Sequence, residues 1–179
     1  MFIFPNKPIR IYDIPRLLAT LPAERWLVQP KWDGKRVHPY CDAEGNITLF
    51  GRQGQTFKEQ WPWLSELPFP RPWFLDGELL RDNRMFIWDF AVWNGEQKFK
   101  TPYQERLEVL QSLIPTMMFQ FGQQGLSLVD TFQIADYAAL LKPGKVNGLE
   151  GVVFKDRMAT NLWGPFSTSE NSSQFKFRL

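Results

Sequence analysis

One stretch of the sequence decides how the rest is interpreted: Gln29-Pro30-Lys31-Trp32-Asp33-Gly34-Lys35-Arg36. The apolar run Trp26-Leu27-Val28 precedes it, and Val37 and Tyr40 follow it. Asp-Gly tolerates the positive φ angles of a tight turn, so the pattern predicts a strand, a hairpin turn at Asp33-Gly34 and a second strand. The lysine at the end of the first strand is then either a solvated charge or a nucleophile whose pKa its neighbours lower.

The composition predicts one folded domain spanning residues 1–179. Of the 179 residues, 44% are hydrophobic and 22% are charged, which is enough for a core and argues against disorder. Aromatic residues make up 16%, which indicates a bulky β-rich core or, for some rings, a stacking platform for a base. The net charge of +2 permits a polyanionic partner without requiring one.

Cysteine and histidine usage restricts the chemistry. Cys41 is the only cysteine, which excludes an intrachain disulfide and a multi-cysteine zinc site. His38 is the only histidine, and we expect it to be a structural residue of the strand after the turn. Any metal would be a hard ion held by carboxylates and phosphates. The sequence shows no signal-peptide pattern and no membrane span, so we expect a soluble, cytoplasmic monomer without a membrane partner.

Turn residues and apolar runs predict an α+β domain with mostly antiparallel sheet. Residues 1–13 should be extended, because Pro5 and Pro8 discourage a helix. Further strands are expected at residues 47–50, 73–75, 85–93, 149–155 and 174–179, and helices at residues 14–21, 57–66, 101–114 and 133–141.

The strongest helix signal follows Thr101. Thr101 can cap the helix, Pro102 fits its first position and Pro115 stops it. The helix at residues 133–141 should end at Pro143-Gly144.

Two clusters place carboxylates beside apolar strands. Asp76-Gly77-Glu78 is either another hairpin turn or a carboxylate directed into a cleft, where it binds a sugar hydroxyl or a metal. Glu150-Gly151-Val152-Val153-Phe154-Lys155 is either a capped core strand or a means of bringing a metal-binding carboxylate and a phosphate-binding lysine to one site.

Two further clusters combine rings with charges. Phe175-Lys176-Phe177-Arg178 alternates rings and cations, so a strand would turn both rings to the core and both cations to the other face. That face is either solvated or an anion site, because adjacent cations repel unless an anion lies between them. In Phe86-Ile87-Trp88-Asp89 the rings could stack on a purine or belong to the core.

Taken in order, these clusters resemble the motifs of the covalent nucleotidyltransferases, which include ATP-dependent DNA ligases, RNA ligases and mRNA capping enzymes. The resemblance covers residues 31–178, with Lys31 to Arg36 similar to motif I, Asp76 to Glu78 to motif III, Trp88-Asp89 to motif IIIa, Glu150 to Lys155 to motif IV and Phe175 to Arg178 to motif V. Arg52 falls where ligases often carry an arginine, and the Asn94-Gly95 turn favours the ligase branch.

This resemblance implies a nucleotidyltransferase (adenylation) domain of antiparallel sheets flanked by helices, with a nucleotide cleft between them. It implies that Lys31 attacks the α-phosphorus of ATP and holds AMP, assisted by Asp33 and Lys176. Nearby cations and a divalent metal would lower the pKa of Lys31. The implied nucleotide-binding residues are Arg36, Arg52, Glu78 for the ribose, Trp88 for the adenine, Lys155, Lys176 and Arg178. The implied ligands of Mg²⁺ or Mn²⁺ are Glu150 and Glu78.

The expected partner is a nicked polynucleotide, DNA in preference to RNA, and the expected function is an ATP-dependent DNA ligase. An RNA ligase, a GTP-using capping guanylyltransferase and a nucleotide-binding module without turnover stay open as alternatives. Arg178 replaces the lysine usual in motif V, and Trp88 replaces the usual Phe or Tyr of motif IIIa. The sequence ends one residue after motif V, so we expect no OB-fold and either a core of a longer protein or a minimal enzyme.

Overall fold

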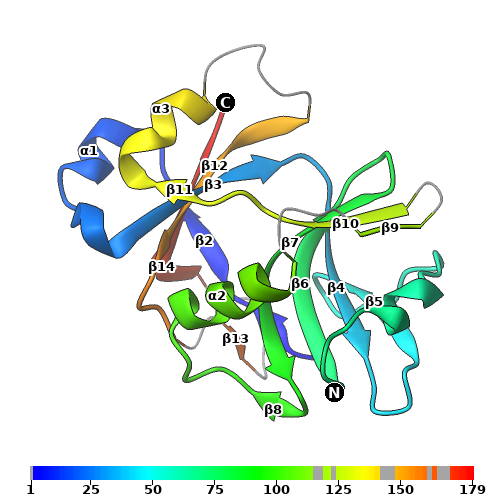
Figure 1. The fold of residues 1–179 in the computed structure, drawn as a ribbon. Helices are drawn as coiled ribbons and strands as arrows, with labels where there is room; N and C mark the ends of the chain where they lie inside the picture. The colour runs from blue at the N-terminus through cyan, green and yellow to red at the C-terminus, as the bar shows by residue number, and fades with distance from the viewer. Residues whose placement is uncertain (1, 115–118, 122–123, 142–147, 161–162, 165–169) are drawn as a thin grey trace.

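The strands form two main sheets in the computed structural model, which describes residues 2–114, 119–121, 124–141, 148–160, 163–164 and 170–179 (Figure 1). The seven-stranded sheet contains β4 (Lys35–Cys41), β5 (Ile47–Gly51), β6 (Trp73–Leu79), β7 (Arg84–Trp93), β8 (Glu96–Gln97), β9 (Phe119–Phe121) and β10 (Gln124–Leu128). The five-stranded sheet contains β2 (Lys7–Arg10), β3 (Trp26–Trp32), β11 (Phe132–Gln133), β12 (Leu149–Asp156) and β14 (Glu170–Arg178). A separate small pair joins β1 (Phe4–Pro5) to β13 (Trp163–Gly164).

Pairing within the two main sheets is mostly antiparallel, which confirms the predicted α+β class. Among the described strands, β10 with β7 and β14 with β2 are the parallel pairs. The strand order is β5-β4-β6-β7-β10-β9 in one sheet and β11-β3-β12-β14-β2 in the other. The two strands that carry the motif I stretch, β3 and β4, therefore belong to different sheets.

The hairpin predicted at Asp33-Gly34 is wrong. The two residues carry the chain from β3 in one sheet to β4 in the other, and Gly34 does not adopt a positive φ. Glycine is needed there for space, because a Cβ atom on Gly34 would lie 2.5 Å from the carbonyl oxygen of Leu79 and 2.9 Å from Cγ of Glu78. Asp-Gly signals a sharp change of chain direction, but the sequence does not show whether the next strand pairs with the previous one.

The turn interpretation of Asp76-Gly77-Glu78 is also excluded, because all three residues lie inside β6. Gly77 allows β6 and β7 to approach closely, since a Cβ atom there would lie 2.4 Å from the carbonyl oxygen of Phe86. The Asn94-Gly95 turn is confirmed, with φ angles of 52° and 76° between β7 and β8.

The helices are shorter than predicted. The structure has α1 (Ile14–Leu18), α2 (Tyr103–Leu113) and α3 (Tyr137–Leu140), with 3-10 helices η1 (Ala23–Arg25), η2 (Pro62–Glu66) and η3 (Ile134–Asp136) among the described residues. Of the helix predicted at residues 57–66, only η2 forms, and the one predicted at 133–141 is divided between η3 and α3. Pro143-Gly144 lies outside the described residues.

The predicted cap of α2 is wrong by one residue, because Pro102 is the N-cap and no side chain caps the helix. The free N–H groups of the first turn are satisfied instead by the segment after β12. The backbone N–H of Tyr103 donates to the carbonyl oxygen of Ala159 at 2.9 Å, and that of Gln104 donates to Arg157 at 2.8 Å. A partner 50 or so residues away in sequence thus replaces the local cap.

Two clusters of buried residues cover the outer faces of the two sheets. A third joins the sheets beside the cleft, where Leu27 of β3 packs with Phe74 of β6 and Leu107 of α2. Figure 1 shows α1 and α3 together on the side of the five-stranded sheet that faces away from the seven-stranded sheet. The cluster under them includes Phe175 and Phe177, which confirms the predicted inward rings of the last strand. His38 is fully buried, as expected of a structural residue. None of the helices in the described residues is long and apolar enough to cross a membrane.

Candidate active site

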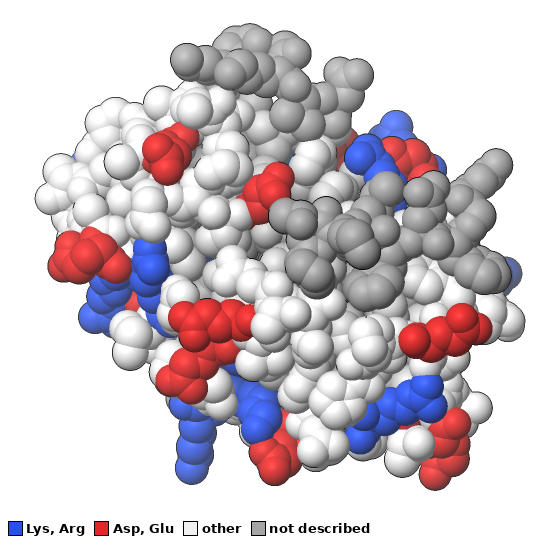
Figure 2. All heavy atoms as spheres, in the orientation of Figure 1, with Lys and Arg blue, Asp and Glu red and all other residues white. Residues whose placement is uncertain are grey.

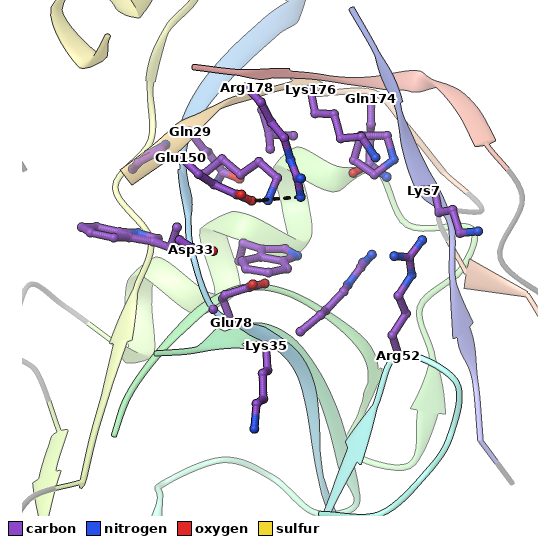
Figure 3. Close-up of a pocket in the computed structure, with 18 of the residues that line it drawn as sticks. Lys7, Gln29, Asp33, Lys35, Arg52, Glu78, Glu150, Gln174, Lys176 and Arg178 are labelled. Atoms are coloured by element: carbon purple, nitrogen blue, oxygen red, sulfur yellow. Dashed lines mark hydrogen bonds and ion pairs between the residues drawn. The ribbon is translucent and has the colours of Figure 1, made fainter. Parts of the chain in front are cut away.

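A cavity of about 570 Å³ lies where the two sheets face each other. It is lined by every residue of the predicted site: Lys31, Asp33, Arg36, Arg52, Glu78, Trp88, Glu150, Lys155, Lys176 and Arg178. Figure 3 shows these side chains arriving from both sheets, with the residues of β3, β12 and β14 on one wall and Glu78 on the other. Strands that are far apart in the sequence therefore contribute to one site.

Strand alternation explains most of the wall formed by the five-stranded sheet. Gln29 and Lys31 are two residues apart on β3, and Gln174, Lys176 and Arg178 follow the same spacing on β14. Side chains two residues apart on a strand point to the same face. The cations of β14 thus enter the cavity while its rings pack against the outer core.

Glu150 and Lys155 need an irregular strand to share the cavity. Their five-residue separation places them on opposite faces of a regular strand. In β12 the register against β3 shifts between Leu149 and Gly151, which is a β-bulge, and Gly151 has a φ of 149°. A Cβ atom on Gly151 would lie 2.0 Å from the carbonyl oxygen of Phe177, so only glycine fits at this point. The bulge brings Glu150 to the same cavity as Lys155.

Lys31 stands at the end of β3 with 18% of its side chain exposed. Its pKa is lowered to about 8, with burial as the largest cause; Arg178 and Lys176 act in the same direction, while Glu78 opposes the shift. The predicted direction of the pKa change is therefore found, but burial of the amine and not the neighbouring cations is its largest cause.

Glu150 joins two cations of the site. One of its oxygens, Oε1, pairs with Nζ of Lys31 and lies 3.3 Å from Nη2 of Arg178, as the dashed lines in Figure 3 indicate. A carboxylate in this position favours the ammonium form of Lys31. The lysine must leave this ion pair, or lose its proton to solvent or a base, before it can act as a nucleophile.

The Arg36 guanidinium lines the cavity but is held by a carboxylate behind it. It donates to both oxygens of Asp76, at 2.9 and 2.6 Å, and Nε1 of Trp88 donates to Asp76 at 2.8 Å. Burial raises the pKa of Asp76, but Arg36 and His38 lower it, and the net direction is down. Asp76 therefore stays ionised and fixes both Arg36 and the Trp88 ring, a role that the sequence did not suggest.

Glu78 faces Lys31 from the opposite sheet. Burial raises its pKa to about 7, although Lys31 and Arg36 act in the other direction. The backbone N–H of Gly34 donates to Glu78. A carboxyl group that titrates near neutral pH in a cleft can accept or donate a hydrogen bond to a ligand hydroxyl.

Lys155 lies deeper than the other cations, with 4% of the residue exposed. Its Nζ atom is 4.5 Å from the ring centre of Tyr103 and 5.5 Å from that of Trp88. Burial lowers its pKa to about 8. Among the described residues no carboxylate oxygen lies within ion-pair distance of this ammonium group, so an anion that enters the cavity can supply the missing partner.

Three solved ligase structures share this arrangement of strands. The ligase domain of LigD from M. tuberculosis has a TM-score of 0.67 at 21% identity and covers 97% of this chain and 59% of that one. The ATP-dependent DNA ligase from bacteriophage T7 in complex with ATP has a TM-score of 0.66 at 14% identity and covers 97% of this chain and 68% of that one. An archaeal ATP-dependent RNA ligase has a TM-score of 0.60 at 17% identity and covers 98% of this chain and 49% of that one.

The chain has the fold of a ligase catalytic domain. No protein-family model and no curated protein sequence matches it. The chain spans 59% and 60% of the length of the two mycobacterial ligase D structures that it resembles. The likeness to ligases thus appears in the three-dimensional arrangement at sequence identities of 14 to 21%.

Several residues of the ligase-fold cleft had weak sequence signals or none. Gln29 could have been found by alternation from Lys31, but Lys7 on β2 carries no motif and enters the cavity only because β2 pairs with β14. Arg10, at the end of β2, is exposed and lies over the ring of Tyr12 at 4.9 Å.

Two predicted ring contacts resolve differently. Phe86 stacks on Trp32 with ring centres 4.5 Å apart, so this ring joins the two sheets and is not free to take a purine. Trp88 lines the cavity and remains the candidate for that contact. Arg52 points into the cleft, whereas Lys35 points away from it (Figure 3).

Proposed function

We propose that this chain transfers AMP from ATP to Nζ of Lys31, as the first step of an ATP-dependent polynucleotide ligase. The observation that supports this most directly is the setting of Lys31. It is a half-buried amine with a pKa of about 8, in a cavity whose walls carry further cations from both sheets. Such an amine is deprotonated often enough near neutral pH to attack phosphorus.

The size and lining of the cavity suit a nucleotide, and the proposal places it in one orientation. Its volume of about 570 Å³ is within the usual range of small-molecule sites, about 300 to 1,000 Å³. The Trp88 ring would stack on the adenine and Glu78 would bind the ribose. The phosphates would then meet the cations of the opposite wall, which are Lys155, Lys176 and Arg178. Arg52 would extend this cationic surface toward the mouth of the cleft.

In the proposed step the neutral Lys31 amine forms a bond from nitrogen to the α-phosphorus. The bond from that phosphorus to the bridging oxygen breaks, pyrophosphate leaves with the electron pair, and the nitrogen releases a proton. Positioning and charge neutralisation supply most of the catalysis in phosphoryl transfer. Asp33 follows the nucleophile at the sheet crossing, where its backbone N–H donates to the carbonyl oxygen of Gly148 at 2.8 Å. This bond holds the end of β3 in place.

The acidic residues fit a magnesium or manganese ion that the nucleotide also ligates. The described residues contain no cluster of three or more Asp, Glu, His or Cys side chains that could hold a metal by themselves. Mg²⁺ bound with ATP usually takes one or two carboxylates, water and phosphate oxygens. Glu150 and Glu78, which line one cavity, would be those carboxylates. A bound ion would neutralise charge on the phosphates.

The proposed second substrate is a nicked polynucleotide, and we favour DNA because several of the structures with this fold are DNA ligases. AMP would pass to the 5′-phosphate of the nick, and the 3′-hydroxyl would then displace it. The face shown in Figure 2 intersperses acidic and basic side chains. We therefore expect nucleic acid to bind mainly at the cation-lined cleft, weakly and with a strong salt dependence. A soluble, cytoplasmic monomer acting alone remains our expectation.

The first test measures the mass of the protein after incubation with ATP and Mg²⁺. The expected result is an added AMP, lost in Lys31→Ala and retained in Lys58→Ala, which removes an exposed lysine outside the cavity. Absence of an adduct on the wild-type protein across a range of pH and metals would refute the proposal. An adduct formed from GTP in preference to ATP would indicate a capping-type enzyme, and tight ATP binding without pyrophosphate release would indicate a binding module.

The second test separates the polynucleotide substrates. Nicked DNA, nicked RNA and hybrid duplexes compete for the preformed AMP adduct, and we expect nicked DNA to discharge it fastest. Preferential discharge by nicked RNA would replace DNA with RNA in the proposal and leave the Lys31 chemistry in place.

A further inference from the structure

The Tyr103 side chain connects three residues of the cavity from outside it. Tyr103 is completely buried at the start of α2. Its hydroxyl oxygen lies 3.0 Å from the carbonyl oxygen of Trp88, 2.8 Å from Nε2 of Gln29 and 3.5 Å from Nζ of Lys155. These partners come from β7, β3 and β12, and hence from both sheets. No sequence motif pointed to this tyrosine.

The hydrogen-bonding capacity of this hydroxyl group is fully used. A phenol has one proton to donate and can accept two hydrogen bonds. Tyr103 donates to the carbonyl group of Trp88, so it must accept from the Gln29 amide and from the Lys155 ammonium. Burial raises the pKa of Tyr103 well above its usual value. The hydroxyl therefore keeps its proton, and this pattern of bonds, throughout the pH range in which an enzyme works.

Tyr103 is itself held rigidly. Its backbone N–H donates to Ala159, and one turn later the guanidinium of Arg106 donates to both oxygens of Asp89, at 2.7 and 3.0 Å. Both side chains of this ion pair are buried. These two anchors fix the start of α2, so the Tyr103 hydroxyl has a fixed position and can determine where the flexible Lys155 side chain places its ammonium group.

The groups in direct contact with the Lys155 ammonium are neutral. Its ammonium group lies over the Tyr103 and Trp88 rings, and the residue paired with it on β14 is the uncharged Gln174. The charged groups that act on it from the surrounding elements are Asp89 of β7, Asp76 of β6, Arg36 of β4 and Arg106 of α2. The Tyr103 hydroxyl is the hydrogen-bond acceptor that the described residues offer to the Lys155 ammonium.

We propose that Tyr103 is a positioning residue for AMP transfer, which acts by holding the Lys155 ammonium against the cavity while fixing the backbone beneath Trp88. Tyr103 touches neither the nucleotide nor Lys31 in this scheme. The inference rests on the proposed function, since the charge on Lys155 matters to the reaction only if phosphate enters the cavity.

The test compares Tyr103→Phe with Tyr137→Phe. Each variant keeps its ring and loses one hydroxyl, and Tyr137 packs on Phe154 at the outer face of the same sheet. An acceptor that favours the ammonium form raises the pKa of Lys155, so its loss should lower that pKa by about 0.5 to 1 unit. In Tyr103→Phe, the decline of the single-turnover AMP-transfer rate at alkaline pH should therefore begin at a pH that is lower by the same amount. The rise of the rate with pH on the acidic side, which reflects Lys31, should not move.

Two further measurements make the test independent of folding. The Cε resonance of Lys155, titrated by NMR in the free protein, should show the same shift in Tyr103→Phe and none in Tyr137→Phe. In a Lys155→Gln background, Tyr103→Phe should lower the rate by less than twofold further, because the group through which it acts is gone.

The outcomes separate the two proposals. A wild-type protein that forms no AMP adduct refutes the proposed function. If the wild type forms the adduct, the role of Tyr103 is tested separately. A Tyr103→Phe variant that loses rate equally at every pH and leaves the Lys155 titration unchanged overturns only that role.

Discussion

Replacing Lys155 with methionine should stabilise the free protein while it slows AMP transfer. The Lys155 pKa falls from 10.5 to about 8 on burial. A shift of this size corresponds to about 3 kcal/mol, at about 1.4 kcal/mol per pKa unit. This is the free-energy cost of keeping the ammonium group in the cavity at neutral pH. Methionine has nearly the same length and no charge, so it should remove that cost.

The stability difference between Lys155→Met and the wild type should change with pH in a defined direction. Below pH 8 the lysine is protonated in both the folded and the unfolded state, and the full cost is present. Between pH 8 and 10.5 the unfolded chain binds more protons than the folded chain, so the wild type gains stability as the pH rises. The advantage of Lys155→Met, about 3 kcal/mol at pH 7, should therefore shrink by roughly half at pH 9.5.

Urea unfolding of both proteins at pH 7 and 9.5 measures the two differences directly. Lys98→Met, which removes a partly exposed lysine paired with Glu96, is the control and should give a difference below about 1 kcal/mol at either pH. The reasoning is refuted if Lys155→Met is less stable than the wild type at pH 7. It is equally refuted if the advantage does not shrink on going to pH 9.5.

Three further predictions concern the nucleophile, the anchor of α2 and the bulge. The single-turnover rate of AMP transfer should rise about tenfold per pH unit below pH 8, the pKa of Lys31, and should fall at higher pH as Lys155 loses its proton; a rise that continues to pH 10 would contradict the role of burial. Asp89→Asn should lower the free energy of unfolding by about 3 to 5 kcal/mol, because it leaves the buried Arg106 charge uncompensated; chemical denaturation would show it, and a loss below about 1 kcal/mol would argue against the buried pair. Gly151→Ala should lower both the melting temperature and the AMP-transfer rate, because it removes the bulge that brings Glu150 to the cavity; an unchanged rate would separate Glu150 from the reaction.

Much of the fold could be predicted from the sequence, because alternation is a local property. The ordered motifs also identified ten residues that line one cavity, and the roles of these residues stay predictions. The cations of β14 and the nucleophile on β3 follow from a period of two once the strands are recognised. Asn94-Gly95 likewise specifies its own turn through the φ angles that it tolerates.

What the sequence could not provide depends on contacts between distant segments. Asp33-Gly34 has the same local preference whether the next strand pairs with the previous one or joins the other sheet. Glu150 and Lys155 share a cavity only because a bulge compensates for their odd spacing. The need for glycine at Gly151 in this bulge comes from the carbonyl oxygen of Phe177 on β14, a contact that the sequence does not show. The pKa of Lys31 is governed mainly by burial, which is a property of the assembled cleft.

The crossing at Asp33-Gly34 also affects how the cleft can open. It ties the two sheets together covalently within two residues of the nucleophile, and the stacked Trp32 and Phe86 rings reinforce the joint from the adjacent position. If one sheet rotates as a rigid body about this joint, displacement grows with distance from it. The mouth of the cleft, near Arg52, would widen by the largest amount, while the gap between the Lys31 amine and Glu78 would change least. Such a rotation would admit a large substrate while it keeps the reacting amine aligned with the sugar site.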